Sequence, residues 1–240
     1  LAKVGTRQPD SSEALECLEL ALRLAPSDPD AHLTLAALQI QQGRHGDALG
    51  HFVQVLQSNP SRREAWCGAA AACTALGKTE DAINFCDMSL KILPDDPEVL
   101  NNRASLRVKL GDHLGALEDF ERLVQAHPGF AKAWNNRGVS LEEIGRIDEA
   151  LACFERAAEL DPGFADAHSN RAKTLMRMQR MDEGLKAAET ALRLDSSHQD
   201  GALNLAMGLL MVGRLQEGLE LYERRWERPG MPLVASADRM

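Results

Sequence analysis

Aromatic residues are scarce in this sequence of 240 residues: they make up 4% of the chain, whereas hydrophobic residues of all kinds make up 44%. Alanine and leucine must therefore do most of the packing. Long apolar runs are missing too, because uncharged stretches such as that from Ala202 to Gly213 are shorter than the roughly 20 residues of a membrane-spanning helix. No basic-then-apolar secretory leader is visible. We expect a cytoplasmic protein, although the chain does not begin with methionine, so a leader lost with a missing start stays an open alternative.

Positive charge is in deficit. The chain has 27 Lys and Arg residues against 36 Asp and Glu residues, which gives a formal net charge of −9. Proteins that bind nucleic acid or anionic membranes generally attract phosphates with an excess of basic residues. We therefore expect neither nucleic acid nor a membrane as the partner.

Sequence patterns of catalysis and metal binding are also missing. There is no G-x-S-x-G, G-x-x-x-x-G-K-[ST], G-x-G-x-x-G or H-E-x-x-H motif, and the five cysteines form no C-x-x-C pair. We interpret the cysteines as small buried residues in a reducing compartment, with Cys17, Cys86 and Cys153 at positions that pack inward. The adjacent carboxylates Glu142 and Glu143 are expected on a helix surface. The sequence thus predicts no enzyme activity, no metal site and no cofactor.

Five prolines occur at a constant spacing. Pro26, Pro60, Pro94, Pro128 and Pro162 are each 34 residues apart, and the next two steps fall on Ser196 and Gly230. This period is the length of one helix–turn–helix repeat. It divides the chain into a partial repeat, 1–28, and six full repeats: 29–62, 63–96, 97–130, 131–164, 165–198 and 199–232.

Other positions recur in phase with the prolines. Small residues at the eighth and twentieth positions of each repeat let two antiparallel helices approach closely, and bulky residues at several of the twenty-fourth positions fill the space to the next pair. Glycine at the fifteenth position is expected to end the first helix, because it takes a left-handed conformation without strain. The twentieth positions are Ala48, Ala82, Ala116, Ala150, Gly184 and Gly218; the twenty-fourth are Phe52, Cys86, Phe120, Phe154, Ala188 and Tyr222; the fifteenth are Gly43, Gly77, Gly111, Gly145, Gln179 and Gly213.

Over residues 29–228 these positions resemble the tetratricopeptide repeat (TPR) family. The resemblance implies an all-α fold, a right-handed superhelical solenoid of antiparallel helix pairs with a 34-residue repeat. We expect one solenoid over 1–228 and a tail or linker over 229–240. The expected helices are 12–24, first helices over 30–42, 64–76, 98–110, 131–144, 165–178 and 199–212, and second helices over 46–58, 80–92, 114–126, 147–160, 181–194 and 215–227.

The first helices of such an array line its concave face, and asparagine recurs there. The sixth position holds Asn102, Asn136, Asn170 and Asn204, and the fifth adds Asn101 and Asn135. A carboxamide both donates and accepts hydrogen bonds, so this column is able to hold a peptide backbone. It resembles the asparagine ladder of O-linked N-acetylglucosamine transferases. The alternative, left open, is that each amide bonds the neighbouring repeat.

Charged residues accompany this column. Lys132, Lys173 and Arg177 are expected to face the groove and contact a peptide. The seventh position carries Arg103, Arg137 and Arg171, which we interpret as arginines with packed stems and paired heads, with cations at the groove edge as the alternative. The lysine–asparagine clamp by which chaperone-binding relatives hold a terminal carboxylate is absent.

The sixth repeat places apolar residues where the earlier repeats are polar. Leu203, Met207, Leu210 and Met211 follow the concave stripe, and Met176 adds to them from the fifth repeat. Exposed apolar patches tend to mark contacts. We expect this patch to be covered by the segment after Trp226, by a partner or by a further domain; packing of these residues on one another is the alternative.

Two functions are compatible with the sequence. The first is a non-catalytic scaffold that binds a protein segment or peptide in its groove, as a monomer or weak homo-oligomer. The second is the substrate-recruiting arm of a bacterial glycosyltransferase, because the phrase Tyr222-Glu-Arg-Arg-Trp226 resembles the end of TPR arrays that precede such a catalytic domain. The start within a repeat suggests a piece of a longer chain. The identity of the partner stays open.

Overall fold

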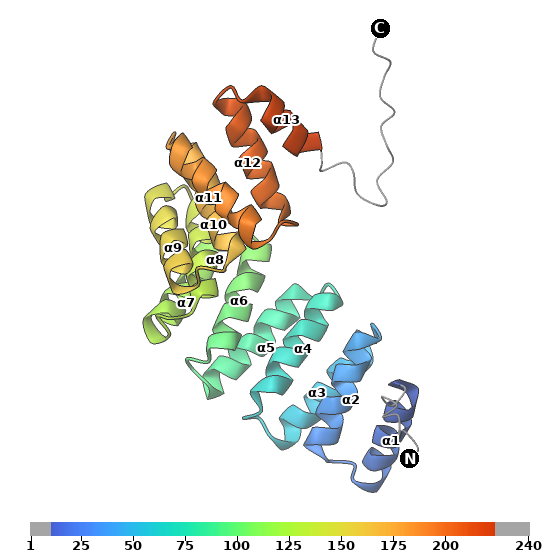
Figure 1. Ribbon diagram of the computed structural model, residues 1–240. Coiled ribbons are helices and arrows are strands. Elements are labelled where there is room, and N and C mark those ends of the chain that lie inside the picture. Colours follow the sequence, from blue (N-terminus) through green and yellow to red (C-terminus); the bar gives the residue numbers. More distant parts are fainter. Residues whose placement is uncertain (1–10, 224–240) are drawn as a thin grey trace, which may run out of the picture. The chain divides into compact units, whose positions relative to one another are not determined.

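The computed structural model describes residues 11–223, and the side chains of residues 14–223. The chain falls into two compact units, divided between Ala126 and His127, and each unit is described by itself (Figure 1). Within the described residues all secondary structure is α-helical. Unit 1 contains α1 (Ser11–Leu24), α2 (Pro29–Gln41), α3 (His45–Ser58), α4 (Arg63–Ala75), α5 (Thr79–Ile92), α6 (Pro97–Lys109) and α7 (His113–Ala126). Unit 2 contains α8 (Ala131–Glu143), α9 (Ile147–Leu160), α10 (Ala165–Arg177), α11 (Met181–Leu194), α12 (Gln199–Met211) and α13 (Leu215–Glu223).

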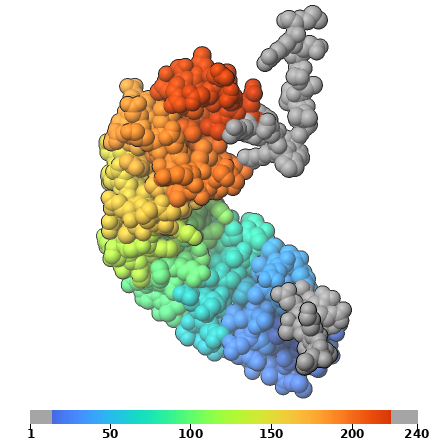
Figure 2. Space-filling view, viewed as in Figure 1, coloured from blue at the N-terminus to red at the C-terminus, as the bar shows by residue number. Residues whose placement is uncertain are grey.

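Consecutive helices pack as pairs. α2 lies against α3, α4 against α5 and α6 against α7 in unit 1, and unit 2 pairs α8 with α9, α10 with α11 and α12 with α13. Figure 2 shows the repeats of each unit as adjoining bands that follow the sequence. The all-α fold is confirmed, and each helix end that falls within the described residues lies within one residue of its expected place. The continuity of the array across both units, and the tail over 229–240, which lies outside the described residues, stay predictions.

The evenly spaced prolines contribute to the packing of the repeats through their carbonyl oxygens. The indole Nε1 of Trp66 donates to the oxygen of Pro60 at 2.7 Å, and Trp134 binds Pro128 in the same way at 3.0 Å. Histidine stands at the same fourth position in two other repeats, where its Nε2 lies 3.0 Å from Pro26 O and 3.1 Å from Pro162 O. The fourth position thus favours a ring nitrogen that ties the first helix to the preceding turn.

Left-handed residues end the first helices as expected. Five glycines at the fifteenth position have φ between 74° and 83°. In the fifth repeat the position holds Gln179, which takes φ 62° and is the one non-glycine residue with positive φ among the described residues. A side chain in this region costs about 1 kcal/mol relative to glycine, so this turn is strained.

The small residues permit the close packing that the repeat requires. The eighth-position alanines and the twentieth-position alanines are buried, and Phe120 and Phe154 are fully buried at the twenty-fourth position. A Cβ atom on Gly138 would lie 2.6 Å from the ring of Phe154. The core of each unit therefore depends on side chains that are small where helices cross and large between helix pairs.

Candidate functional site

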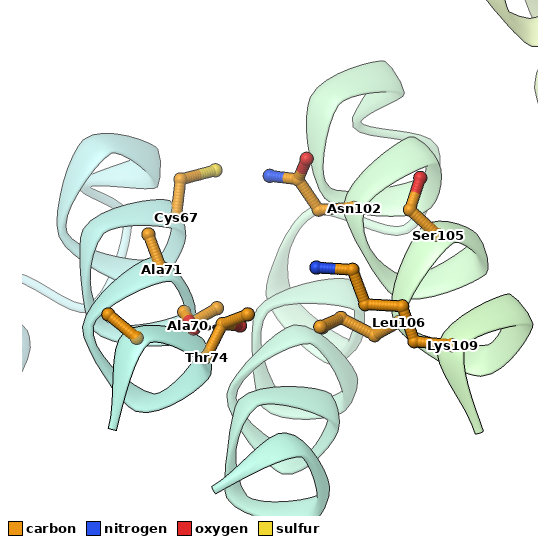
Figure 3. A pocket seen from close by; sticks show the side chains of 9 residues that line it. Cys67, Ala70, Ala71, Thr74, Asn102, Ser105, Leu106 and Lys109 are labelled. Carbon is orange, nitrogen blue, oxygen red and sulfur yellow. Dashed lines mark hydrogen bonds between the residues drawn. The ribbon is translucent and has the colours of Figure 1, made fainter. Parts of the chain in front are cut away.

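A trough lies between the first helices of two successive repeats in unit 1. It has a volume of about 360 Å³ and lies between α4 and α6 (Figure 3). Its walls are two stripes at helical spacing, over two turns of each helix. The lining residues are Cys67, Ala70, Ala71, Thr74 and Ala75 on α4, and Asn102, Ser105, Leu106 and Lys109 on α6.

Two polar side chains of the trough have no partner among the residues that the structure describes. The carboxamide of Asn102 makes no hydrogen bond with any residue between 11 and 223, and Lys109 makes no ion pair with them. The side chain of Lys109 reaches back from α6 toward the space between the helices (Figure 3). The hydroxyls of Thr74 and Ser105, by contrast, donate to carbonyl oxygens of their own helices at 2.8 Å. An amide and an ammonium group are thus available to a ligand above an apolar floor.

The later asparagines of the same column are already bonded. Asn170 Nδ2 donates to Asn135 Oδ1 at 2.9 Å, and Asn204 Nδ2 donates to both the carbonyl and the hydroxyl oxygen of Ser169 at 3.1 Å. In both cases the acceptor residue stands 35 positions earlier, at the fifth position of the preceding repeat. For these two residues the geometry favours the structural alternative, in which the amide joins neighbouring repeats.

The exception at Asn102 has a chemical cause. The residue 35 positions before it is Cys67, and a thiol is a weak hydrogen-bond acceptor. Burial, followed by the carboxylates of Glu98 and Asp96, raises the pKa of the Cys67 thiol to about 12, so the sulfur carries no charge that could attract the amide. Figure 3 shows the two side chains facing each other across one end of the trough.

The remaining asparagines of the predicted site lie on the same helices. Asn135 is buried, and its Nδ2 lies 3.4 Å from Asn136 Oδ1. Asn136 is half-buried on α8, and Asn101 is half-buried on α6, where its carbonyl oxygen accepts the Ser105 hydroxyl. Their contact with a peptide stays a prediction.

Two of the three predicted cations are bound within the protein. Lys173 Nζ lies 2.8 Å from Glu142 Oε2, and Arg177 Nη1 lies 3.8 Å from Glu142 Oε1. Glu142 itself is only 6% exposed, so its expected place on a helix surface was wrong: two cations of α10 lie over this residue of α8. Lys132 is exposed on α8 and makes no ion pair with the described residues.

Two of the three seventh-position arginines, Arg103 and Arg171, pair with carboxylates, as interpreted from the sequence. Arg103 binds the buried carboxylate of Asp119 through Nε and Nη2 and reaches Asp87 through Nη1. Arg171 Nε lies 3.5 Å from Glu155 Oε1.

Arg137, the third of them, donates to Cys153 Sγ at 3.0 Å, and its guanidinium lies 5.9 Å from the ring centroid of Trp134. In this repeat a thiol and an indole therefore contact the guanidinium.

The predicted apolar patch is smaller than expected. Met176 is 7% exposed and belongs to the core of unit 2, so its assignment to the surface patch was wrong. Its side chain fills space left by two glycines, Gly184 and Gly208, where an added Cβ would lie within 2.7 Å of it. Met207 and Met211 are 49% and 61% exposed, whereas Leu203 and Leu210 are partly buried. Gly184, at the twentieth position where four other repeats have alanine, was the sequence signal that a larger residue, Met176, packs against it.

The cysteines follow the expectation with one correction. Cys86 and Cys153 are buried, but Cys17 is exposed, because its helix, α1, packs mainly on α2 within the described residues. Within residues 11–223 no group of three or more His, Cys, Asp or Glu side chains is arranged to hold a metal ion. In the same part of the chain no helix combines the length and apolar character needed to cross a bilayer.

Comparison with known protein families identifies the array. One tetratricopeptide repeat model matches residues 7–53 and 101–165. A second matches residues 39–106 and 143–195, just over half of the chain. The chain therefore belongs to the tetratricopeptide repeat family. A comparison with curated proteins found no match.

Solved structures share this fold. A tetratricopeptide repeat protein from Parabacteroides merdae superposes with a TM-score of 0.71 at 20% identity, over 90% of this chain and 85% of its own. PilW, a widely conserved type IV pilus biogenesis factor, gives a TM-score of 0.71 at 21% identity, over 82% and 91%. YrrB, a TPR protein with an unusual peptide-binding site, gives 0.61 at 22% identity, over 84% and 100%. Identities this low show a common fold, and the relation to arrays that precede a glycosyltransferase stays a prediction.

Proposed function

We propose that this protein is a non-catalytic interaction module that binds an extended segment of another protein in the trough between α4 and α6. The observation that carries the proposal is the Asn102 carboxamide, which lines the trough without a hydrogen-bond partner among the described residues. Its counterparts Asn170 and Asn204 are bonded to the preceding repeat. A carboxamide without a hydrogen-bond partner at the edge of a trough is suited to bind a backbone N–H or C=O group of a ligand.

The dimensions of the trough suit a short stretch of extended chain. Its walls run from Cys67 to Ala75 on α4 and from Asn102 to Lys109 on α6. At 1.5 Å per residue these stripes are roughly 10–12 Å long. An extended chain advances about 3.3–3.6 Å per residue, so about three residues fit along the trough.

The chemistry of the trough supports binding rather than catalysis. Cys67 is its one thiol, and a thiol with a pKa of about 12 has almost no thiolate at neutral pH to act as a nucleophile. The hydroxyls of Thr74 and Ser105 face no histidine or carboxylate of the lining that could act as a base. A bound segment is therefore expected to dissociate without chemical change.

A peptide library displayed on phage tests the proposal. Peptides selected on the purified protein are synthesised with a fluorophore, and their dissociation constants are measured by fluorescence anisotropy. Ala71 is exposed and lines the trough, so Ala71→Gln places a longer side chain there while keeping a good helix former. We expect this variant to weaken binding at least tenfold.

The matched control is Ala152→Gln, the same change at an exposed position of α9 in unit 2. It should leave the dissociation constant unchanged. Equal binding by both variants and the unmodified protein would place the peptide elsewhere and exclude the trough as its site.

A second candidate function is the substrate-recruiting arm of a bacterial glycosyltransferase. It is supported by the phrase Tyr222-Glu-Arg-Arg-Trp226, most of which lies outside the described residues. The coding sequence downstream of Met240 tests this candidate, because a nucleotide-sugar-binding domain should follow. An unrelated sequence or a stop codon there would remove it.

A further inference from the structure

The trough has a polar part and an apolar part, and the division limits which side chains fit it. The Asn102 amide and the Lys109 ammonium group supply the polar part. Leu106 is 5% exposed and Ala70 is 3% exposed, so both form the floor of the apolar part, next to the methyl group of Thr74. Cys67 adds a neutral thiol at the end near Asn102.

The charge available to a ligand in the trough is positive. Lys109 has no ion pair within the described residues, whereas the two carboxylates near the Cys67 end do not line the trough and share the guanidinium group of Arg63, whose Nε lies 3.4 Å from Glu98 Oε2. Asp96 lies 3.8 Å from the same guanidinium group. Among the residues that line the trough, a carboxylate on the ligand therefore finds an unpaired cation, and an ammonium group on the ligand finds no anion.

Extended backbone sets the spacing of the two side chains. Successive side chains of an extended segment point to opposite sides, so residues i and i+2 enter the same trough about 7 Å apart. Two such side chains fit within a trough roughly 10–12 Å long, one in each part. The residue between them points away and is not selected.

We propose that the trough recognises an extended protein segment in which an aliphatic side chain and an acidic side chain stand two residues apart. The aliphatic group packs on Leu106, Ala70 and Thr74, the carboxylate pairs with Lys109, and the Asn102 amide binds the backbone. This inference rests on the proposed function, and it adds the chemistry and the spacing of the ligand. The geometry is compatible with either chain direction, so both orders of the two residues are included in the test.

Three capped peptides of one composition test the spacing. Ser-Gly-Val-Ser-Glu-Gly-Ser and Ser-Gly-Glu-Ser-Val-Gly-Ser place valine and glutamate two residues apart, and Ser-Gly-Val-Glu-Ser-Gly-Ser places them side by side. Each is acetylated, amidated and titrated into the labelled protein while NMR shifts of the trough residues are followed. We expect one of the first two to bind at least threefold more tightly than the third. Equal affinities, or no binding by any of them, would overturn the inference.

A charge exchange tests the role of Lys109. With Lys109→Glu, the best of these peptides should lose about two- to fivefold in affinity, as expected for an exposed ion pair, and its counterpart with lysine in place of glutamate should gain. The matched control is Lys186→Glu, the same change at an exposed lysine of α11, which should alter neither affinity. The inference is wrong if the ranking of the two peptides stays the same in Lys109→Glu.

These results separate the inference from the proposed function. Peptides selected from the library that depend on Ala71, but that show no preference for the aliphatic–acidic spacing, would retain the binding function and exclude this ligand chemistry. Selected peptides that bind the Ala71→Gln variant as tightly as the unmodified protein would exclude both the proposed function and this ligand chemistry.

Discussion

The ion-pair network around Arg103 gives the most exact prediction of stability. Arg103 on α6 is 12% exposed, and the carboxylate of Asp119 on α7, to which it donates two hydrogen bonds, is 2% exposed. A third bond of 2.5 Å reaches Asp87 on α5. The arginine thus joins three consecutive helices of unit 1.

Arg103→Met keeps most of the packed stem but leaves the buried Asp119 carboxylate without its main partner. Removing one member of a buried ion pair costs about 3–5 kcal/mol. Arg107 Nη1 remains 3.0 Å from Asp119 Oδ2, so the loss should lie near the lower end, at about 3 kcal/mol. The double variant Arg103→Met with Asp119→Leu should recover most of this loss, because no unpaired carboxylate is left inside and Arg107 keeps the carbonyl oxygen of Gly115 as a partner.

Arg171→Met is the matched control at the same position of a later repeat. Arg171 and its partner Glu155 are 31% and 41% exposed, and such pairs contribute about 0–1 kcal/mol.

Urea denaturation measures both changes. The chain contains three tryptophans, and each variant is followed by fluorescence in a background that keeps only the tryptophan of its own unit, Trp66 or Trp134. A loss in Arg103→Met no larger than that in Arg171→Met, or a double variant as unstable as the single one, would refute the reasoning.

The remaining predictions concern a strained turn, a close contact and a pair of histidines. Gln179→Gly should raise the unfolding free energy by about 1 kcal/mol, measured in urea, because glycine accepts φ 62° without strain; an unchanged value would show that the turn is not strained. Gly138→Ala should lower the melting temperature, because the new Cβ would lie 2.6 Å from the buried Phe154 ring; a rise would mean that the ring moves aside at no cost. Burial, followed by the charge of His32, lowers the pKa of His51 from 6.5. The unfolded chain therefore binds the proton more readily than the folded one. The unfolding free energy should be at its full value above about pH 6.5 and should fall as the pH drops through the lower pKa of the folded state. His51→Asn should flatten this fall in urea denaturation at several pH values, and an equally steep fall would exclude the pair as its cause.

Much of the fold could be predicted from the sequence because each repeat obeys the same local rules. The positions of Gly43 and its equivalents gave the helix ends, and small residues such as Ala104 marked the places where helices cross. The site was harder to predict, since it depends on pairs of residues in different repeats.

The asparagine column shows where prediction of the site from the sequence fails. Four residues of one type at one position suggested one role, but the role of each depends on the residue 35 positions earlier: Asn135 and Ser169 accept a hydrogen bond, and Cys67 does not. Glu142 shows the same limit, because its burial comes from two cations of the next repeat. Such pairings become visible only once the register between neighbouring helices is known.

The most direct test of the binding function compares two asparagines of one column. With a peptide selected on the purified protein, Asn102→Ala should weaken binding about two- to tenfold, the value of one hydrogen bond, and leave the melting temperature unchanged or higher. Asn170→Ala should leave binding unchanged and lower the unfolding free energy by about 1 kcal/mol or more, because the buried Asn135 loses its donor. Unchanged affinity in Asn102→Ala, or an equal loss of affinity in both variants, would contradict the assignment of the binding site to Asn102.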